Sequence, residues 1–116
     1  MIEELWDIIQ RSLQKCPWLE KQSLYDLLQA LSSEIEEIKK ALDEKDLDNL
    51  EEEIGDLIYD AFLVGVVAKR DYGINLDNSI KRVVKKISHR KPWLFWERRI
   101  SLEEAEKIWR ERKKKV

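Results

Sequence analysis

The fold is decided by residues 54–68, which read IGDLIYDAFLVGVVA. The charged residues in this run are Asp56 and Asp60 alone. At about 100° per residue around a helix, its apolar side chains cover well over half of the circumference. A helix that is apolar on most sides must be buried on most sides. The run therefore predicts a helix that other helices, or a second copy of the chain, must cover.

Stop signals and capping residues divide the rest of the chain into further helices. Pro17 breaks the first helix, Gly73 follows the third and Pro92 ends the fourth. Ser23 with Asp26 has the spacing of an N-terminal capping box. The five expected helices run from about Ile2 to Lys15, from Ser23 to Glu44, from Asp46 or Asp48 to Tyr72, from Asn75 or Asp77 to Lys91, and from Ser101, with Glu104 as its capping partner, to Lys113.

Composition agrees with an all-α fold. The 116 residues include 3 glycines and 2 prolines, too few for the many turns of a β-sandwich or barrel. They also supply no glycine-rich phosphate loop. We therefore expect one domain over residues 1–116, with a four-helix-bundle-like core and an additional short C-terminal helix.

Charge and residue counts exclude several classes of protein. The net charge is −2, so no overall charge drives the chain onto nucleic acid or an anionic membrane. One cysteine excludes an internal disulfide, and one histidine argues against a His-rich zinc site. The N-terminus has no signal-peptide pattern, and the run at residues 54–68 is too short to cross a bilayer. We expect a cytoplasmic protein without nucleic-acid or membrane partners.

Acidic residues border the apolar face of the helix expected at residues 23–44. The apolar stripe of this helix is formed by Leu27, Leu31, Ile38 and Ala41. Glu34 falls within the stripe and Glu37 lies about 60° to its side, while Glu36 points nearly opposite. A charged residue on an apolar face needs an explanation, because burying it without a partner is costly.

The next helix repeats this arrangement. Glu53, Asp56 and Asp60 fall in a sector of roughly 60° at the margin of its apolar arc. Carboxylates this close repel one another, and a divalent cation relieves the conflict. Oxygen ligands at this density suit Mg²⁺ or Mn²⁺ rather than zinc. The alternative is that these side chains are partly exposed and pair with lysines of neighbouring helices.

The helix expected at residues 75–91 carries the complementary charge. Arg82, Lys86 and Arg90 recur at every fourth residue beside Val83 and Ile87. A polyphosphate bound at a metal site needs such cations, and ordinary surface decoration is the alternative. The five tryptophans are expected mostly in packing roles, with one or two available to stack on a nucleobase.

The order of these motifs resembles the MazG family of all-α nucleotide pyrophosphohydrolases, from about Cys16 to the end of the chain. Residues 16–23, CPWLEKQS, resemble its Cys-Pro-Trp-Asp…Gln-Thr opening. Glu34 and Glu37 match the last two glutamates of its Glu-Glu-x-x-Glu element. Its Glu-x-x-Asp element, its Arg-Arg-His-Pro-His-Val-Phe stretch and its C-terminal Glu-Glu-Ala…Trp…Lys pattern resemble residues 53–57, 89–95 and 103–113.

The resemblance implies Mg²⁺-dependent hydrolysis of a nucleoside or deoxynucleoside triphosphate to the monophosphate and pyrophosphate, with Mn²⁺ able to substitute. A house-cleaning role toward non-standard nucleotides is one form of this activity. The family's ligand and contact positions correspond to Glu34, Glu37, Glu53 and Asp56 for the metal, and to Trp18, Lys86, Arg90, Trp109 and Lys113 for nucleotide or phosphate. Glu37 or Asp60 is the expected catalytic residue that positions or deprotonates water. Homodimers or dimers of dimers are also implied.

The sequence departs from the family pattern at four positions. Ser33 stands at the usual first glutamate, Leu19 replaces an aspartate, and Lys91 and Trp93 replace two histidines. One alternative is a phosphoribosyl-ATP pyrophosphohydrolase-like enzyme, against which the Cys-Pro-Trp opening and the Trp109 segment argue. The other is a helical interaction module that has lost catalysis, which only Ser33 favours.

Overall fold

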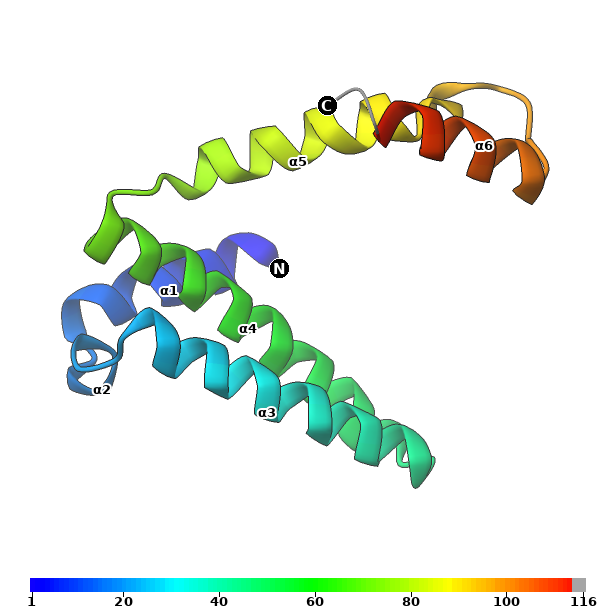
Figure 1. Cartoon of the computed structure of the whole chain (residues 1–116). Coiled ribbons are helices and arrows are strands. Elements are labelled where there is room, and N and C mark those ends of the chain that lie inside the picture. Colours follow the sequence, from blue (N-terminus) through cyan, green and yellow to red (C-terminus); the bar gives the residue numbers. More distant parts are fainter. Residues whose placement is uncertain (114–116) are drawn as a thin grey trace. The chain divides into compact units, whose positions relative to one another are not determined.

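The computed structural model describes residues 1–113 and consists of helices joined by short connections (Figure 1). The elements in chain order are α1 (Ile2–Lys15), α2 (Pro17–Glu20), α3 (Leu24–Asp43), α4 (Leu47–Tyr72), α5 (Leu76–Arg90), the 3-10 helix η1 (Pro92–Phe95) and α6 (Leu102–Lys113). None of the described residues forms a β-strand. The predicted all-α class is confirmed, and each of the five predicted helices is present within one or two residues of its expected bounds.

Local hydrogen bonds explain where the helices begin. The Ser23 hydroxyl accepts from the Asp26 amide at 3.1 Å, and the Ser23 amide donates to the Asp26 carboxylate at 2.9 Å. This is the predicted capping box. Asp46 caps α4, and the Ser101 hydroxyl accepts from the backbone amide of Glu104 at 3.1 Å at the start of α6.

Two left-handed residues end the long helices. Gly73 follows α4 with a φ of 70°, the conformation that a C-terminal glycine adopts without strain. Lys45 follows α3 with a φ of 55°. The amides of Asp46 and Lys45 donate to the carbonyls of Ala41 and Leu42, the bonding pattern of a Schellman motif. The chain thus turns from α3 into α4 within three residues.

The two short helices were not predicted from the sequence. Both α2 and η1 have a proline in their first turn, at Pro17 and Pro92. Proline is well suited to the first helical position because the missing N–H has no partner there in any helix. The sequence pattern assigns both prolines to the ends of the preceding helices, and in the structure each also starts a helix of its own.

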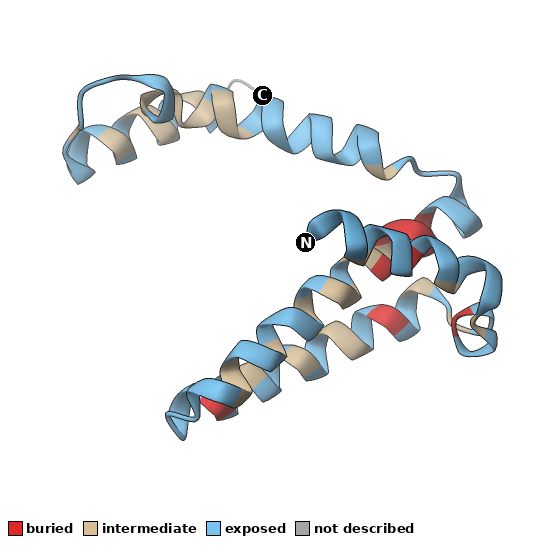
Figure 2. Cartoon of the chain, turned by 180° about the vertical axis from the view of Figure 1, so that it is seen from behind, coloured by how far each residue is buried: buried red, intermediate tan, exposed pale blue. Residues whose placement is uncertain are grey.

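The chain forms two compact units, Met1–Asn75 and Leu76–Val116, of which the second is described up to residue 113. The expectation of one domain over residues 1–116 stays a prediction. In the first unit α4 packs along α3 and against α1. Its core consists of Ile9, Leu19, Leu27, Leu63, Val66 and Val67, so α1, α2, α3 and the second half of α4 all contribute. In Figure 2 most of the buried segments, drawn in red, lie toward one end of the first unit, and one lies at the opposite end.

The first half of α4 is less covered than its second half. In the second half, Leu63 and the residues from 65 to 68 are buried. In the first half, Ile54 and Ile58 are 44% and 45% exposed. The apolar arc of α4 is therefore more completely covered in its second half, where α1 packs against it in addition to α3.

The second unit is built from α5, η1 and α6. Helix α6 packs against α5, and the Arg112 guanidinium donates to the backbone carbonyl of His89 at 2.8 Å. Neither α5 nor α6 contains a fully buried residue. Among the described residues, no helix has both the length and the apolar character that crossing a bilayer requires.

Candidate metal centre

Helices α3 and α4 bring three carboxylates together. Glu34 of α3 and Glu53 and Asp56 of α4 each place one oxygen so that all three oxygens lie within 4.8 Å of one another. Glu34 and Glu53 are half-buried and Asp56 is exposed. The site is therefore open to solvent on the Asp56 side and lined by the α3–α4 packing on the other.

The apolar stripe of α3 explains why Glu34 points toward α4. Leu27 and Ala41 on that stripe are buried, and Leu31 is half-buried. Glu34 lies on the same face, so packing the stripe against α4 also turns its carboxyl group inward. The predicted location of Glu34 within the apolar face is confirmed.

One oxygen of Glu34 is left without a partner. Its Oε2 atom is buried and accepts no hydrogen bond from any described residue. A buried carboxylate oxygen in this state costs free energy unless an ion or a proton satisfies it. Within residues 1–113 no ion pair with a lysine or arginine is formed by Glu34, Glu53, Asp56 or Asp60. The alternative of lysine pairing is therefore not what the structure shows.

The close packing of these carboxyl groups raises the pKa values of two of them, Glu34 and Asp60. The pKa of Glu34 is raised from 4.5 to about 7, first by a hydrogen bond with Glu53, then by burial and by the charges of Glu53, Asp56 and Asp60. Burial and the charge of Asp56 also raise the pKa of Asp60. A pKa of about 7 means that, without a cation, Glu34 is partly protonated near neutral pH.

The donor set fits a small divalent cation. Octahedral Mg²⁺ holds oxygens at about 2.1 Å, so ligands on opposite sides of the ion are roughly 4.2 Å apart. Adjacent ligands are roughly 3.0 Å apart, so three oxygens within 4.8 Å of one another need small side-chain shifts, of up to about 2 Å, to surround an ion. The cluster holds no nitrogen or sulfur ligand, which favours Mg²⁺ or Mn²⁺ over zinc.

Two other predicted acidic residues lie outside the three-carboxylate cluster. Glu37 is exposed on α3, at the margin where the helical angles placed it. Asp60 is half-buried one turn beyond Asp56. The metal role of Glu37, and the catalytic role of Glu37 or Asp60, stay predictions. Glu36 is exposed and pairs with Lys39 at 3.5 Å, in agreement with its predicted solvent-facing position.

The predicted phosphate and base contacts belong mainly to the second unit. Arg90 is half-buried, and its Nε atom is buried without a hydrogen-bond partner among the described residues. The Lys113 ammonium lies 4.5 Å from the centroid of the Trp109 ring, a cation–π contact. Lys86 is exposed, and Trp18, in the first unit, is 53% exposed. Their roles in binding stay predictions.

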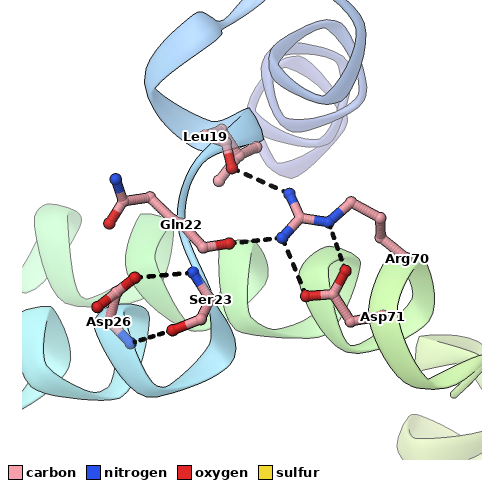
Figure 3. A network of polar contacts seen from close by, with 6 residues as sticks. All are labelled: Leu19, Gln22, Ser23, Asp26, Arg70 and Asp71. Carbon is pink, nitrogen blue, oxygen red and sulfur yellow. Dashed lines mark hydrogen bonds and ion pairs between the residues drawn. The ribbon is translucent and has the colours of Figure 1, made fainter.

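Sequence reasoning missed one polar network in the first unit. Arg70, near the end of α4, donates to the carbonyls of Leu19 and Gln22 and to the carboxylate of Asp71 (Figure 3). The carbonyl acceptors are main-chain atoms about 50 residues away, so no side-chain pattern could reveal them. The only signal was a charged pair, Arg70 and Asp71, beside the glycine stop.

The fold and this cluster define an all-α protein in which two antiparallel helices present a candidate divalent-cation site. The model of the MazG nucleotide pyrophosphohydrolase domain matches residues 22–95, well over half of the chain. The chain belongs to the MazG nucleotide pyrophosphohydrolase family.

Individual proteins support this assignment. The chain is 30% identical over 97 residues to the nucleoside triphosphate pyrophosphohydrolase/pyrophosphatase MazG of Thermotoga maritima, covering 82% of this chain and 38% of the relative. It is 32% identical over 80 residues to the uncharacterized protein YabN of Bacillus subtilis, covering 69% of this chain and 16% of the relative. The chain therefore spans well under half the length of these curated relatives. A mazG-related protein from Thermotoga maritima has a crystal structure with a TM-score of 0.95 and 70% identity, over 97% of this chain and 98% of that one.

Proposed function

We propose that this protein is a Mg²⁺-dependent pyrophosphohydrolase that converts nucleoside or deoxynucleoside triphosphates to monophosphates and pyrophosphate. The observation that carries the proposal is the meeting of Glu34 with Glu53 and Asp56, in which a buried oxygen of Glu34 has no protein partner. Membership of the MazG family supports the reaction class, and the 30% identity to a nucleoside triphosphate pyrophosphohydrolase supports the substrate class.

The carboxylates would hold the cation between α3 and α4, where the triphosphate oxygens can reach it from the exposed Asp56 side. When bound, a divalent cation neutralises phosphate charge and lowers the pKa of a coordinated water. Glu34 must be ionised before it can bind a cation, because only the ionised carboxylate is a ligand. Metal binding by this site is thus coupled to proton release near pH 7.

Water attack on the α-phosphorus forms one P–O bond while the bond to the oxygen bridging the α- and β-phosphorus breaks. Asp60 is the residue we assign to accept the proton of that water. Asp60 is half-buried and lies one helical turn from Asp56, on the same side of α4. Its raised pKa makes it a stronger base than an ordinary aspartate. Glu37 is the second candidate, since it lies three residues from Glu34 on the adjoining margin of α3.

Cations are required where negative charge develops on the phosphates. Lys86 and Arg90 are one turn apart on α5, and the buried Nε of Arg90 is a donor without a partner among the described residues. A phosphate oxygen is a suitable acceptor for such a donor, because the guanidinium fork matches its geometry. We assign these two residues to triphosphate binding.

A pyrophosphate-release assay over a substrate panel tests the proposal. The panel contains the standard and deoxy nucleoside triphosphates, deaminated and oxidised triphosphates, and phosphoribosyl-ATP, each with Mg²⁺, with Mn²⁺ and with EDTA. Equimolar monophosphate and pyrophosphate that disappear with EDTA support the proposal. Turnover of phosphoribosyl-ATP alone would move the protein to that enzyme class. No turnover of any member with either metal would leave an inactive helical interaction module.

We also propose that a second copy of the chain covers the exposed apolar residues of α3 and the first half of α4. Leu28, Ile35 and Leu42 recur at intervals of seven residues on α3 and are 48%, 46% and 60% exposed. Apolar residues at this spacing lie in one row along a helix and are typical of helix–helix interfaces. Ile54 and Ile58 of α4 are exposed to a similar degree. A homodimer, alone or paired into a dimer of dimers, would bury them.

A further inference from the structure

Arg70 joins two segments of the first unit that are distant in sequence. Its guanidinium donates to the Leu19 carbonyl at 2.9 Å and to the Gln22 carbonyl (Figure 3). The same side chain holds the Asp71 carboxylate by two hydrogen bonds of 2.8 and 3.0 Å. These bonds keep the pKa of Asp71 below its ordinary value, so Asp71 stays charged and fixes the orientation of the guanidinium.

The bonded segment leads directly into α3. Gln22 precedes Ser23, whose capping box with Asp26 starts the helix. Leu19 is 1% exposed and belongs to the core, so its side chain anchors the start of the connection from α2 to α3. Arg70 binds the main chain at both ends of this connection, at Leu19 and at Gln22. Arg70 itself lies in the last turn of α4. The guanidinium therefore ties the beginning of α3 to the end of α4.

The carboxylate cluster lies between this tie and the turn that joins the two helices. Glu34 is near the middle of α3, and Glu53 and Asp56 are in the first half of α4. At about 1.5 Å per residue, Glu34 is roughly 15 Å from each end of α3. The α3–α4 pair is thus held by the Schellman turn on one side of the cluster and by Arg70 on the other.

Small axial slips would break the cluster. A slip of α3 by one residue along α4 moves Glu34 by about 1.5 Å, a large part of an Mg–O bond of about 2.1 Å. The three oxygens lie within 4.8 Å of one another, and a further separation of this size would place Glu34 too far away to bind the same ion.

We propose that Arg70 is a positioning residue for the metal centre: by binding the carbonyls of Leu19 and Gln22 it fixes the axial register of α3 against α4 and so holds Glu34 opposite Glu53 and Asp56. This inference builds on the metal site of the proposed function. A guanidinium is suited to this task because its planar fork bonds two carbonyls and a carboxylate at once, which a lysine ammonium cannot do with the same geometry.

Two measurements on the full chain test the inference. Spin labels attached through Glu36→Cys on α3 and Glu52→Cys on α4, in a Cys16→Ser background, report the register as a distance distribution by pulsed electron resonance. Both label positions are exposed. Titration with Mn²⁺ of the unlabelled proteins gives the metal Kd. Arg70→Ala should broaden the distance distribution and raise the Mn²⁺ Kd by about 10-fold or more, with an unchanged helical signal in circular dichroism.

Arg11→Ala is the matched control, because Arg11 also binds an aspartate, Asp7, at 2.8 Å, but within its own helix. It should leave both the distances and the Kd at their original values. Arg70→Lys keeps the charge and most of the aliphatic part of the side chain, and it replaces Arg70→Ala in both measurements if Arg70→Ala does not fold. It should give a broadened distribution with a smaller loss of affinity.

A distance distribution in the folded Arg70 variants that equals the original one would overturn the inference, as would equal shifts in Arg11→Ala. If the original protein binds no Mn²⁺, the proposed metal site fails, and with it the assignment of Arg70 to a metal centre. The distances then still show whether Arg70 fixes the helix register. The two failures are therefore distinguishable.

Discussion

Glu34 of α3 and Glu53 of α4 bring their carboxyl groups together across the two helices, each with one oxygen within 4.8 Å of the other and of an oxygen of Asp56. This contact, with burial and the nearby aspartates, raises the pKa of Glu34 to about 7. The helix pair thus holds its carboxylates together against their own repulsion, which is the state expected of a site prepared for a cation.

Removing a cluster carboxylate should abolish turnover without unfolding the protein. Glu53→Gln or Asp56→Asn is expected to lower kcat for triphosphate hydrolysis by at least about 100-fold, because each removes a charged ligand. The thermal unfolding of the metal-free protein should be unchanged or shifted upward, since each change also relieves repulsion. Glu36→Gln, at an exposed position paired with Lys39, is the control and should retain activity. Near-normal turnover in either cluster variant would show that the metal assignment is wrong.

The metal-free protein should lose stability as the pH rises toward neutrality. The pKa of Glu34 is higher in the folded state, about 7, than its ordinary value of 4.5, so the folded state binds this proton more tightly. The resulting contribution is fully present below about pH 4.5 and disappears as the pH passes 7. Urea unfolding in EDTA across this range, compared with Glu34→Gln, isolates the effect. The difference between the two proteins should change with pH; parallel curves would contradict the raised pKa of Glu34.

The basic residues of α5 should matter for substrate more than for folding. Lys86→Ala and Arg90→Ala are expected to raise KM for the triphosphate by about 10-fold or more, because each removes a charged phosphate contact. Lys81→Ala is a suitable control, since Lys81 pairs with Asp77 on the exposed surface of the same helix. Unfolding midpoints should stay within a few degrees for all three. A loss of stability without any change in KM would favour surface decoration.

The chain should be at least a dimer in solution. Light scattering at micromolar concentration is expected to give a multiple of 14.0 kDa. Ile35→Glu introduces a charge into the exposed apolar row of α3 and should lower the mass toward that of one chain. Glu36→Ala, on the next position around the helix, should not. A mass of one chain together with full activity in the original protein would refute the proposed dimer.

The turn between α3 and α4 offers a direct test of stability. Lys45 adopts a φ of 55°, a conformation that costs a residue with a side chain roughly 1 kcal/mol. Lys45→Gly should therefore increase the free energy of unfolding by up to about 1 kcal/mol, whereas Lys40→Gly inside α3 should decrease it by about the same amount. Urea denaturation measures both. Destabilisation by Lys45→Gly would show that the lysine side chain itself stabilises the turn.

Much of this structure could be predicted because its determinants are local. Ser23, Asp46 and Gly73 set helix ends through bonds to residues three to five positions away, and such patterns can be recognised in the sequence. The positions of Glu34, Glu53 and Asp56 followed from helical angles, since a charge on an apolar face is turned toward the neighbouring helix as the face packs. Which of the acidic residues meet could not be deduced, because it depends on the axial offset of α3 and α4.

What escaped prediction depends on non-local or main-chain contacts. Arg70 binds carbonyl groups, which every residue possesses, so nothing in the residue types of Leu19 or Gln22 marks them as its partners. The exposure of Ile54 and Ile58 likewise reflects how far α1 reaches along α4, a matter of helix length and crossing that periodicity does not record. The short helices α2 and η1 are too brief to produce a periodic pattern.

The division of the chain at Asn75 has a consequence for how such a protein can evolve. The carboxylate cluster belongs to Met1–Asn75, whereas four of the residues assigned to the nucleotide, Lys86, Arg90, Trp109 and Lys113, follow Leu76. The matched family segment ends at residue 95, before α6 begins. Under the proposed function, substitutions in α6 would change contacts with the base or sugar and leave the helix pair that carries the carboxylate cluster unaltered. The residues that select the substrate and the residues that hold the metal could then change at different rates within one gene.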